Sequence, residues 1–193
     1  MTRRTLDIIF SIGGLLLAGL ILTLGLVLQN QANFAEDYVH DQLQAQQITF
    51  TPAQALSPEE NAQCLKDNAE KQLVTGKQAE CYANEYIGLH LQDVNDGKTY
   101  AQTSSEARAI EDQDSPEAQE LNAKVQTLFR GETLRGLLLT SYGFSIFGDR
   151  AQTAAYVCFL VALVLLLAAV AGFVHAASKS AEHRILSESS PND

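Results

Sequence analysis

Two long stretches without a formal charge, one near each end, constrain this chain of 193 residues more than any other feature. They cover residues 8–28 and residues 151–178, and the second is strictly apolar from residue 157 to residue 174. As a helix rising about 1.5 Å per residue, the shorter stretch extends about 31 Å, which matches the hydrocarbon core of a bilayer. Helices that are apolar on every face suit lipid better than water. The sequence therefore predicts an integral membrane protein whose first partner is the lipid bilayer.

Basic residues close to these stretches indicate how the chain is oriented. Arg3 and Arg4 precede the first stretch and Lys179 and Arg184 follow the second, whereas the first charges after residue 28 are acidic. Positive flanks stay in the cytoplasm. The first stretch is longer than the apolar core of a signal peptide, so we expect an anchor that is not cleaved. The expected layout in the cell membrane is a cytoplasmic tail (1–7), a first transmembrane helix (8–28), an extracytoplasmic domain (29–150), a second transmembrane helix (151–178) and a cytoplasmic tail (179–193).

The formal net charge of −10 lies wholly on residues 30–150, because the charges of the two tails balance. Binding of nucleic acid needs a basic face that neutralises phosphates, so we expect no nucleic-acid partner. Anionic lipid headgroups also repel an acidic domain. We therefore expect the middle segment to contact the membrane only close to the two transmembrane helices.

Three cysteines are present, and two of them share one compartment in this layout. Cys158 falls in the second transmembrane helix, where a free thiol behaves as a small apolar group. Cys64 and Cys81 fall in the extracytoplasmic segment, where oxidising conditions permit a disulfide. A metal pair and a redox pair are the alternatives, but no CxxC or neighbouring histidine cluster accompanies the two cysteines. We predict a structural disulfide that stabilises the domain by about 3 kcal/mol.

Helical signals dominate the middle segment. The first transmembrane helix is expected to continue to about residue 47, followed by an extended link over residues 48–52. Capping signals predict helix starts at Ser57 and at Ser115, each followed by proline and glutamate. The remaining local signals predict an amphipathic helix over 78–91 and a turn at Asn95-Asp96-Gly97. Together they predict an all-α protein, with two transmembrane helices flanking a small helical domain.

Residues 136–148 form a further uncharged run of the sequence. The run is too short to cross a bilayer, so an interfacial or re-entrant segment is one interpretation and a buried helix under the domain is the other. In the first interpretation Tyr142, Phe144 and Phe147 lie at the headgroup boundary, where aromatic side chains gather.

Each predicted transmembrane helix repeats small residues at intervals of seven. Such repeats let two helices approach closely with a left-handed crossing, so we interpret them as helix-packing positions that face each other or a partner's helix. An alanine-rich helix also produces such repeats by chance. The residues are Ser11, Ala18 and Gly25 in the first helix and Ala155, Ala162, Ala169 and Ala176 in the second.

Two histidines of the middle segment raise the question of a metal centre. His40 and His90, with Glu36 or Asp93, have the residue types of a two-histidine, one-carboxylate iron site. No His-to-acid spacing is common to both histidines, and no nucleophile or phosphate-loop motif is present. We therefore predict no catalytic residue, no metal ligand and no cofactor. A membrane-tethered metal-dependent enzyme and a small-ligand sensor with an outer domain stay open as alternatives.

Three blocks of the chain carry a resemblance to a known family. They are MTRRTLDIIFSIGGLLLAGLILTLGLVLQNQANFA, then GKQAECYANEYIGLHL with GKTY, and FRGETLRGLLLTSYGFSIFGDRA. Across nearly its whole length the chain resembles a family of small two-span membrane proteins of actinobacteria. Its members often carry the label "aromatic ring-opening dioxygenase LigA", but true ring-opening dioxygenases are soluble iron enzymes whose metal-ligand pattern this chain lacks, so we take the label as misapplied. The resemblance assigns no functional residue.

These observations favour a non-catalytic role over an enzymatic one. We expect a scaffold or accessory subunit of a cell-envelope complex, with a membrane-protein partner or self-association.

Overall fold

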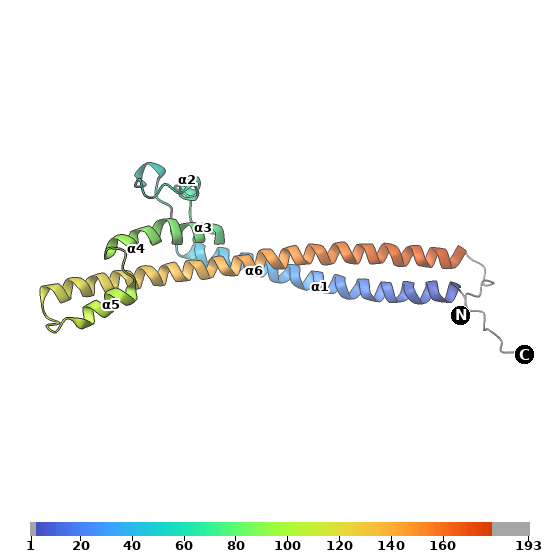
Figure 1. The fold of residues 1–193 in the computed structure, drawn as a ribbon. Helices are drawn as coiled ribbons and strands as arrows, with labels where there is room; N and C mark the ends of the chain where they lie inside the picture. Colours follow the sequence, from blue (N-terminus) through green and yellow to red (C-terminus); the bar gives the residue numbers. More distant parts are fainter. Residues whose placement is uncertain (1–2, 179–193) are drawn as a thin grey trace, which may run out of the picture. The chain divides into compact units, whose positions relative to one another are not determined.

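The computed structural model describes residues 3–178, and this part of the chain is helical almost throughout, with one isolated β-bridge between Thr49 and Gln72 and no strand (Figure 1). The expected all-α class is therefore confirmed. In chain order the elements are the α-helix α1 (Arg3–Ala45), the 3-10 turn η1 (Ala53–Ala55), the helices α2 (Gln63–Asn68) and α3 (Gly76–Cys81), the π-helical turn η2 (Tyr82–Ile87), and the helices α4 (Gly88–Val94), α5 (Tyr100–Ala109) and α6 (Pro116–Ser178).

The chain divides into two compact units. We call Met1–Asn33 together with Asp149–Asp193 the paired-helix unit, and Phe34–Gly148 the central unit. The paired-helix unit takes its described residues from the start of α1 and the end of α6. The central unit contains the shorter helices and the remaining parts of α1 and α6.

In the paired-helix unit α1 and α6 run antiparallel. Positions further along α1 lie next to positions earlier in α6. A Cβ atom on Gly14 would lie 3.7 Å from that of Ala169, and one on Gly25 would lie 3.1 Å from that of Cys158. Only a hydrogen atom fits at Gly25, since the same added Cβ would be 2.7 Å from the ring of Phe159. The two backbones therefore approach as closely as small residues allow.

The central unit has its own hydrophobic core. α1 contributes Val39 and Leu43 to it, and α6 contributes Leu128 and Leu138. The other buried members are Phe50, Leu65, Leu73, Ala79, Cys81, Ala83, Ile87 and Leu91. All of the shorter segments except η1 and α5 thus place a side chain in this core.

Some local predictions hold and others need correction. The turn at Asn95-Asp96-Gly97 is present, with positive φ angles of 50° at Asp96 and 75° at Gly97. The helix start at Ser115 is also present, since its hydroxyl accepts a hydrogen bond from the Ala118 backbone N–H. The helix start at Ser57 is wrong, because α2 begins only at Gln63. Ser57 and Glu60 still form the two hydrogen bonds of a capping box, 2.7 and 3.3 Å long, but without a helix behind them.

The amphipathic helix expected over residues 78–91 is one helical stretch that changes type in its middle. Thr75 and Gln78 form the capping box that starts α3, and the π-helical turn η2 then leads into α4. A Cβ atom on Gly88 would be 3.3 Å from the Ala83 carbonyl oxygen and 3.6 Å from Nε of Arg135. Glycine at this position therefore leaves room for the wider turn and for the arginine beside it.

Residues 136–148 lie in the middle of α6 and form no re-entrant hairpin. The hydroxyls of Thr140 and Ser141 hydrogen-bond to carbonyl oxygens one turn earlier, so these polar groups are satisfied within the helix. Leu138 is buried and Leu139 packs against the core of the central unit. These residues are thus part of a continuous helix, one face of which lies in that core, and their position at a membrane surface stays a prediction.

Candidate functional site

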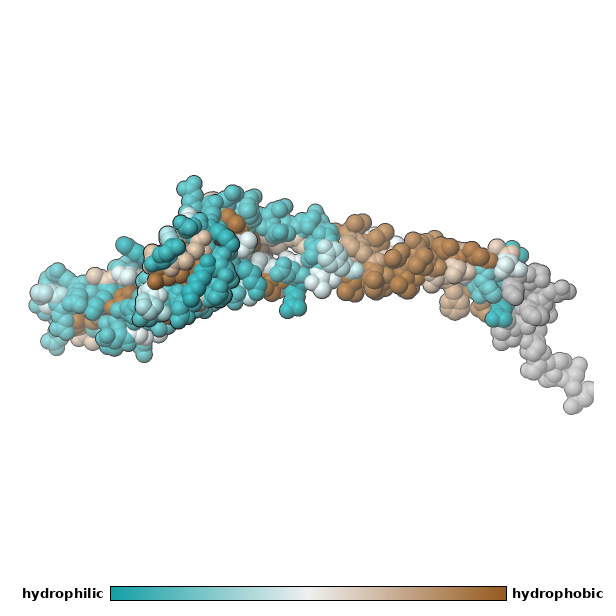
Figure 2. Space-filling view, turned by 90° about the horizontal axis from the view of Figure 1, so that it is seen from above, coloured by the Kyte–Doolittle hydropathy of each residue, from teal (hydrophilic) through white to brown (hydrophobic). Residues whose placement is uncertain are grey.

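In the paired-helix unit the large apolar side chains point outward and are exposed. Phe10, Leu16 and Leu160 are 75%, 71% and 66% exposed, and similar side chains cover both helices (Figure 2). Water-soluble proteins bury such groups, and the largest apolar patch on a monomer is only a few hundred Å². Both α1 and α6 are also long and apolar enough to cross a membrane. This face is therefore suited to an apolar solvent.

The small residues that the sequence singled out lie on the opposite, inner side. All seven residues of the two stripes are buried, and the described structure places them between α1 and α6. Gly172 of α6 also lies close to the hydroxyl of Ser11, the residue four positions after Asp7 on α1. The buried residues are Ser11, Ala18 and Gly25 of α1 and Ala155, Ala162, Ala169 and Ala176 of α6.

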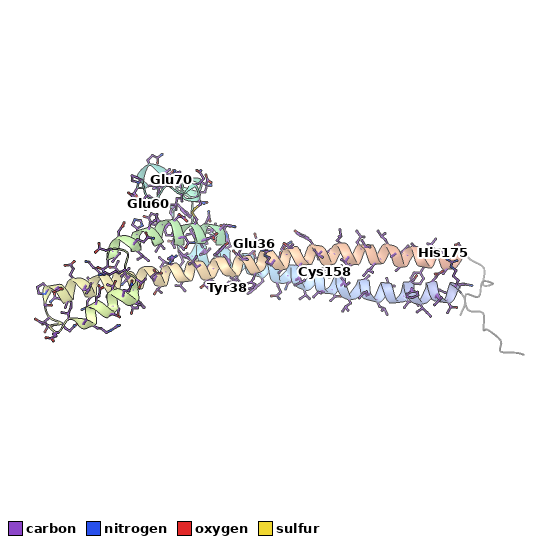
Figure 3. The ribbon with its side chains drawn as sticks, in the orientation of Figure 1. Glu36, Tyr38, Glu60, Glu70, Cys158 and His175 are labelled. Carbon is purple, nitrogen blue, oxygen red and sulfur yellow. A yellow bond between two sulfur atoms is a disulfide. The ribbon has the colours of Figure 1, made fainter. Side chains whose placement is uncertain are left out.

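A polar pair marks each end of this apolar contact. Gln29 and Gln152 exchange two amide hydrogen bonds of 2.8 and 3.0 Å. At the other end is His175, labelled in Figure 3, and its Nε2 atom lies 3.9 Å from the carboxylate of Asp7. Along α1 the residues from Asp7 to Gln29 extend about 33 Å, close to the thickness of a bilayer's hydrocarbon core. Sequence reasoning missed both pairs, although polar residues at both ends of each apolar run were a signal.

In the central unit a disulfide joins two short helices. Cys64 of α2 and Cys81 of α3 lie at disulfide distance, with their sulfur atoms 1.98 Å and their Cα atoms 6.1 Å apart. A shallow, open pocket of about 450 Å³ lies over this pair. Asn68, Lys77 and Glu80 are among the residues that line it. The pairing expected from the sequence is thus present, and the pocket beside it is partly open to solvent.

A row of rings runs along the helix that begins with α3. The ring centroids of Phe50 and Tyr82 are 5.2 Å apart, those of Tyr82 and Tyr86 are 4.8 Å apart, and those of Tyr86 and His90 are 4.5 Å apart. Glu60, in the segment between η1 and α2 (Figure 3), lies beside His90 at the end of this row. It is 6% exposed, and its Oε1 atom lies 3.4 Å from His90 Nε2.

These surroundings change the acidity of Tyr82. Burial raises the pKa of Tyr82 above the ordinary value of 10.0, and the neighbouring Tyr86 and Glu60 raise it further. All three causes act against the phenolate, because burial removes water from the charge and the neighbours add negative charge.

The raised pKa of Tyr82 predicts a loss of stability in alkali. Above about pH 10 the unfolded chain loses this proton while the folded chain keeps it, so the free energy of unfolding falls as pH rises further. We expect Tyr82→Phe to fall less steeply than the wild type in denaturant titrations above pH 10. Tyr100→Phe, which removes an exposed hydroxyl, is the matched control and should follow the wild type. Equal slopes for both variants would contradict this prediction.

The structure does not assemble the imagined iron site. Within residues 3–178 no group of three or more His, Cys, Asp or Glu side chains is placed to hold a metal ion. His90 instead contacts Glu60, and its Nδ1 atom lies 2.9 Å from the Tyr86 carbonyl oxygen. His40 is exposed on α1.

The three aromatic residues expected at a headgroup boundary have different surroundings. Phe147 is 75% exposed, and Phe144 packs edge-on against Tyr38 of α1 at 5.7 Å between centroids. Tyr142 is half-buried, with the Lys77 ammonium 5.8 Å from its ring centroid. Phe34 stacks on Tyr38 at 5.8 Å and completes a small aromatic cluster that the sequence did not reveal.

Comparison with known proteins gives no relative for this chain: no family model, no curated protein and no solved structure matches it. The resemblance to two-span actinobacterial proteins therefore stays a prediction.

Proposed function

We propose that this chain is a two-span protein of the cell membrane that serves as a non-catalytic scaffold or accessory subunit of a cell-envelope complex. In this proposal both ends of the chain are cytoplasmic and the central unit is extracytoplasmic. The lipid bilayer surrounds the paired-helix unit, and a membrane protein or a second copy of the chain is the further partner.

The packing of the paired-helix unit, with small residues between the helices and large apolar side chains on the outer surface, carries the proposal. Lipid tails are as apolar as leucine, so large side chains gain nothing by leaving lipid, and close approach of helices through small residues drives association instead. The polar pairs at Gln29–Gln152 and Asp7–His175 fall where headgroups and water would solvate them. Solvation by water alone would leave an extended apolar surface exposed.

Two observations support the proposed orientation. Arg3 and Arg4 precede the first apolar stretch, and basic flanks remain on the cytoplasmic side. The Cys64–Cys81 pair lies at disulfide distance, and disulfides persist in the oxidising space outside the cytoplasm. With this orientation Phe144, Phe147 and Tyr142 lie on the outer side, where aromatic residues favour the headgroup boundary.

The buried polar groups of the central unit support a structural rather than a catalytic role. Asn95 donates a hydrogen bond of 3.1 Å to the hydroxyl of Thr103 and so ties the turn to α5. Ser104 accepts one from Arg108 on the same helix. Glu60 accepts one from the backbone of Ser57. Each of these groups fixes the local backbone or a neighbouring element, which is what a scaffold domain needs.

A single cysteine reporter tests location and partnership together. Ser105 is exposed on α5, so Ser105→Cys in a Cys158→Ala background presents a thiol on the central unit. We expect a membrane-impermeant cross-linker, with a maleimide at one end and a photoreactive group at the other, to react with this thiol in intact cells. On illumination it should yield one adduct of discrete larger mass, with either a second copy or an envelope protein.

The matched control places the thiol at the other end of the paired-helix unit. Thr5→Cys in the same background, which keeps both Arg3 and Arg4, should react only after the cells are made permeable. The reverse labelling pattern would overturn the orientation. Outside labelling that gives only the singly modified chain would overturn the scaffold role.

A further inference from the structure

The two sulfur atoms of the disulfide differ in how a dissolved thiol can reach them. Cys64 and Cys81 are both among the residues that line the pocket over the bond, and this pocket is partly open to solvent. Cys64 is half-buried, whereas Cys81 is only 6% exposed and belongs to the hydrophobic core. The rate of thiol–disulfide exchange depends on access to the sulfur that is attacked. The pocket therefore gives a thiol access to Cys64, while an attack on Cys81 requires that core side chains move.

The charged groups of the pocket determine which thiols it favours. Its lining includes the carboxylates of Glu80 and Glu85 and the ammonium of Lys77. The amides of Asn68 and Gln78 also line it, and they are joined by a hydrogen bond of 3.1 Å. The lining thus has two negative charges and one positive charge. An anionic thiol is repelled there relative to a neutral or cationic one.

A cation accompanies the sulfur that would leave. Lys77 and Cys81 are four residues apart on α3, and side chains with this spacing are neighbours on a helix surface. The Lys77 ammonium lies 5.8 Å from the ring centroid of Tyr142. A neighbouring lysine stabilises a thiolate. Departure of Cys81 as a thiolate is therefore favoured on the side of the bond that a thiol cannot reach.

We propose that the Cys64–Cys81 bond is the substrate of thiol–disulfide exchange with a dithiol carried by a partner protein, and that the attack falls on Cys64. The partner's thiolate bonds to Cys64 Sγ, the bond between the two Sγ atoms breaks, and Cys81 leaves as a thiolate that takes a proton from water. The partner's second thiolate then attacks the partner sulfur of the mixed disulfide and releases Cys64, which also takes up a proton. The chain gains two electrons, the partner is oxidised to a disulfide, and the reverse sequence closes the bond again.

Exchange at this bond changes how α2 is held. The bond ties α2 covalently to α3, and without it α2 depends on contacts such as the burial of Leu65 in the core. A helix of six residues is not stable by itself, so loss of the bond loosens this segment. The exchange chemistry is a property of the central unit alone; only the compartment of the partner rests on the proposed function. In that compartment the partner is an envelope protein whose dithiol has neutral or basic surroundings.

Reaction of the purified full chain with small thiols in detergent micelles tests the site of attack. Cys158→Ala is the background, so that only the disulfide can react. We expect the monothiols cysteamine and mercaptoethanesulfonate to form a mixed disulfide on Cys64, located by mass spectrometry of peptides after an acid quench. Dithiothreitol should continue to full reduction. A mixed disulfide found mainly on Cys81 would overturn the proposal.

A variant of the core distinguishes direct attack from attack that waits for unfolding. Ile87→Val shortens a buried side chain that does not line the pocket. Such a change typically lowers stability enough to speed an unfolding-dependent reaction by about two- to tenfold. We expect the variant to react with cysteamine at the wild-type rate. A rate that rises in step with the loss of stability, measured for the same variant by denaturation, would show that the pocket gives no access.

Substitution of the two carboxylates tests the preference of the pocket. Glu80→Gln with Glu85→Gln should raise the rate with anionic mercaptoethanesulfonate and lower the rate with cationic cysteamine. We expect the ratio of the two rates to change by about tenfold at low ionic strength. Asp37→Asn with Asp41→Asn removes two exposed carboxylates of α1 outside the pocket and should leave the ratio unchanged. Equal effects of the two double variants would overturn selection by this pocket, whatever the outcome of the labelling experiment in cells.

Discussion

Replacing Ala162 and Ala169 together by leucine is expected to separate α1 from α6 in the paired-helix unit. Both alanines are buried, at 5% and 4% exposure, and a Cβ atom on Gly14 would already lie 3.7 Å from Ala169. An isobutyl group cannot enter that space without moving a backbone. Overpacking typically costs about 1–3 kcal/mol per site, so the two leucine substitutions together should lower the free energy of unfolding by about 2–6 kcal/mol.

Cross-linking at the end of the helix pair measures this separation directly. Gln29→Cys with Gln152→Cys replaces two side chains that hydrogen-bond to each other, so a short bifunctional thiol reagent should cross-link the two thiols within one chain in a Cys158→Ala background. We expect the two leucines to abolish most of this cross-link and to lower the denaturation midpoint in detergent.

The matched control makes the same chemical change on the outer face of the same helix. Ala168 and Ala171 are exposed, so Ala168→Leu with Ala171→Leu should leave the cross-link intact and change stability by less than about 0.5 kcal/mol. Equal cross-linking in both leucine pairs would show that the small-residue stripes do not hold the helices together.

The features that the sequence revealed are those with a local or periodic cause. Apolar runs predict helices directly, and small residues every seven positions mark one face of a helix without knowledge of its partner. The contact between Gln29 and Gln152 has neither property. The two residues are 123 positions apart, and their pairing depends on the register of α1 against α6, which no local pattern encodes.

The central unit shows the same division between local and tertiary causes. The Cys64–Cys81 pairing was predictable because only two cysteines shared one compartment in the expected layout. The sequence Ser57-Pro58-Glu59-Glu60 was misinterpreted because its capping signals are real but one helical turn is too short to be stable by itself. Packing of Leu56 and Ala62 against the core decided the path of the chain there. The meeting of Glu60 with His90 followed from that path and could not have been predicted.

Loss of the Cys64–Cys81 bond is expected to destabilise the central unit by about 3 kcal/mol. The two cysteines are 17 positions apart, and closing a loop of that length removes about this much chain entropy from the unfolded state. The bond also anchors α2, a helix of only six residues that cannot be stable alone. We expect Cys64→Ser with Cys81→Ser to lower the free energy of unfolding accordingly and to open residues 51–68 to proteolysis.

A substitution of the third cysteine distinguishes the effect of losing the disulfide from the effect of losing a thiol. Cys158→Ser removes a thiol that is not bonded, so it should leave the proteolysis of residues 51–68 unchanged, with or without a reducing agent. A reducing agent should convert the wild type to the behaviour of the double variant. Equal stability of reduced and oxidised protein would contradict the structural role of the bond. Because the bond survives only in an oxidising compartment, finding it reduced in freshly lysed cells would also place the central unit on the cytoplasmic side.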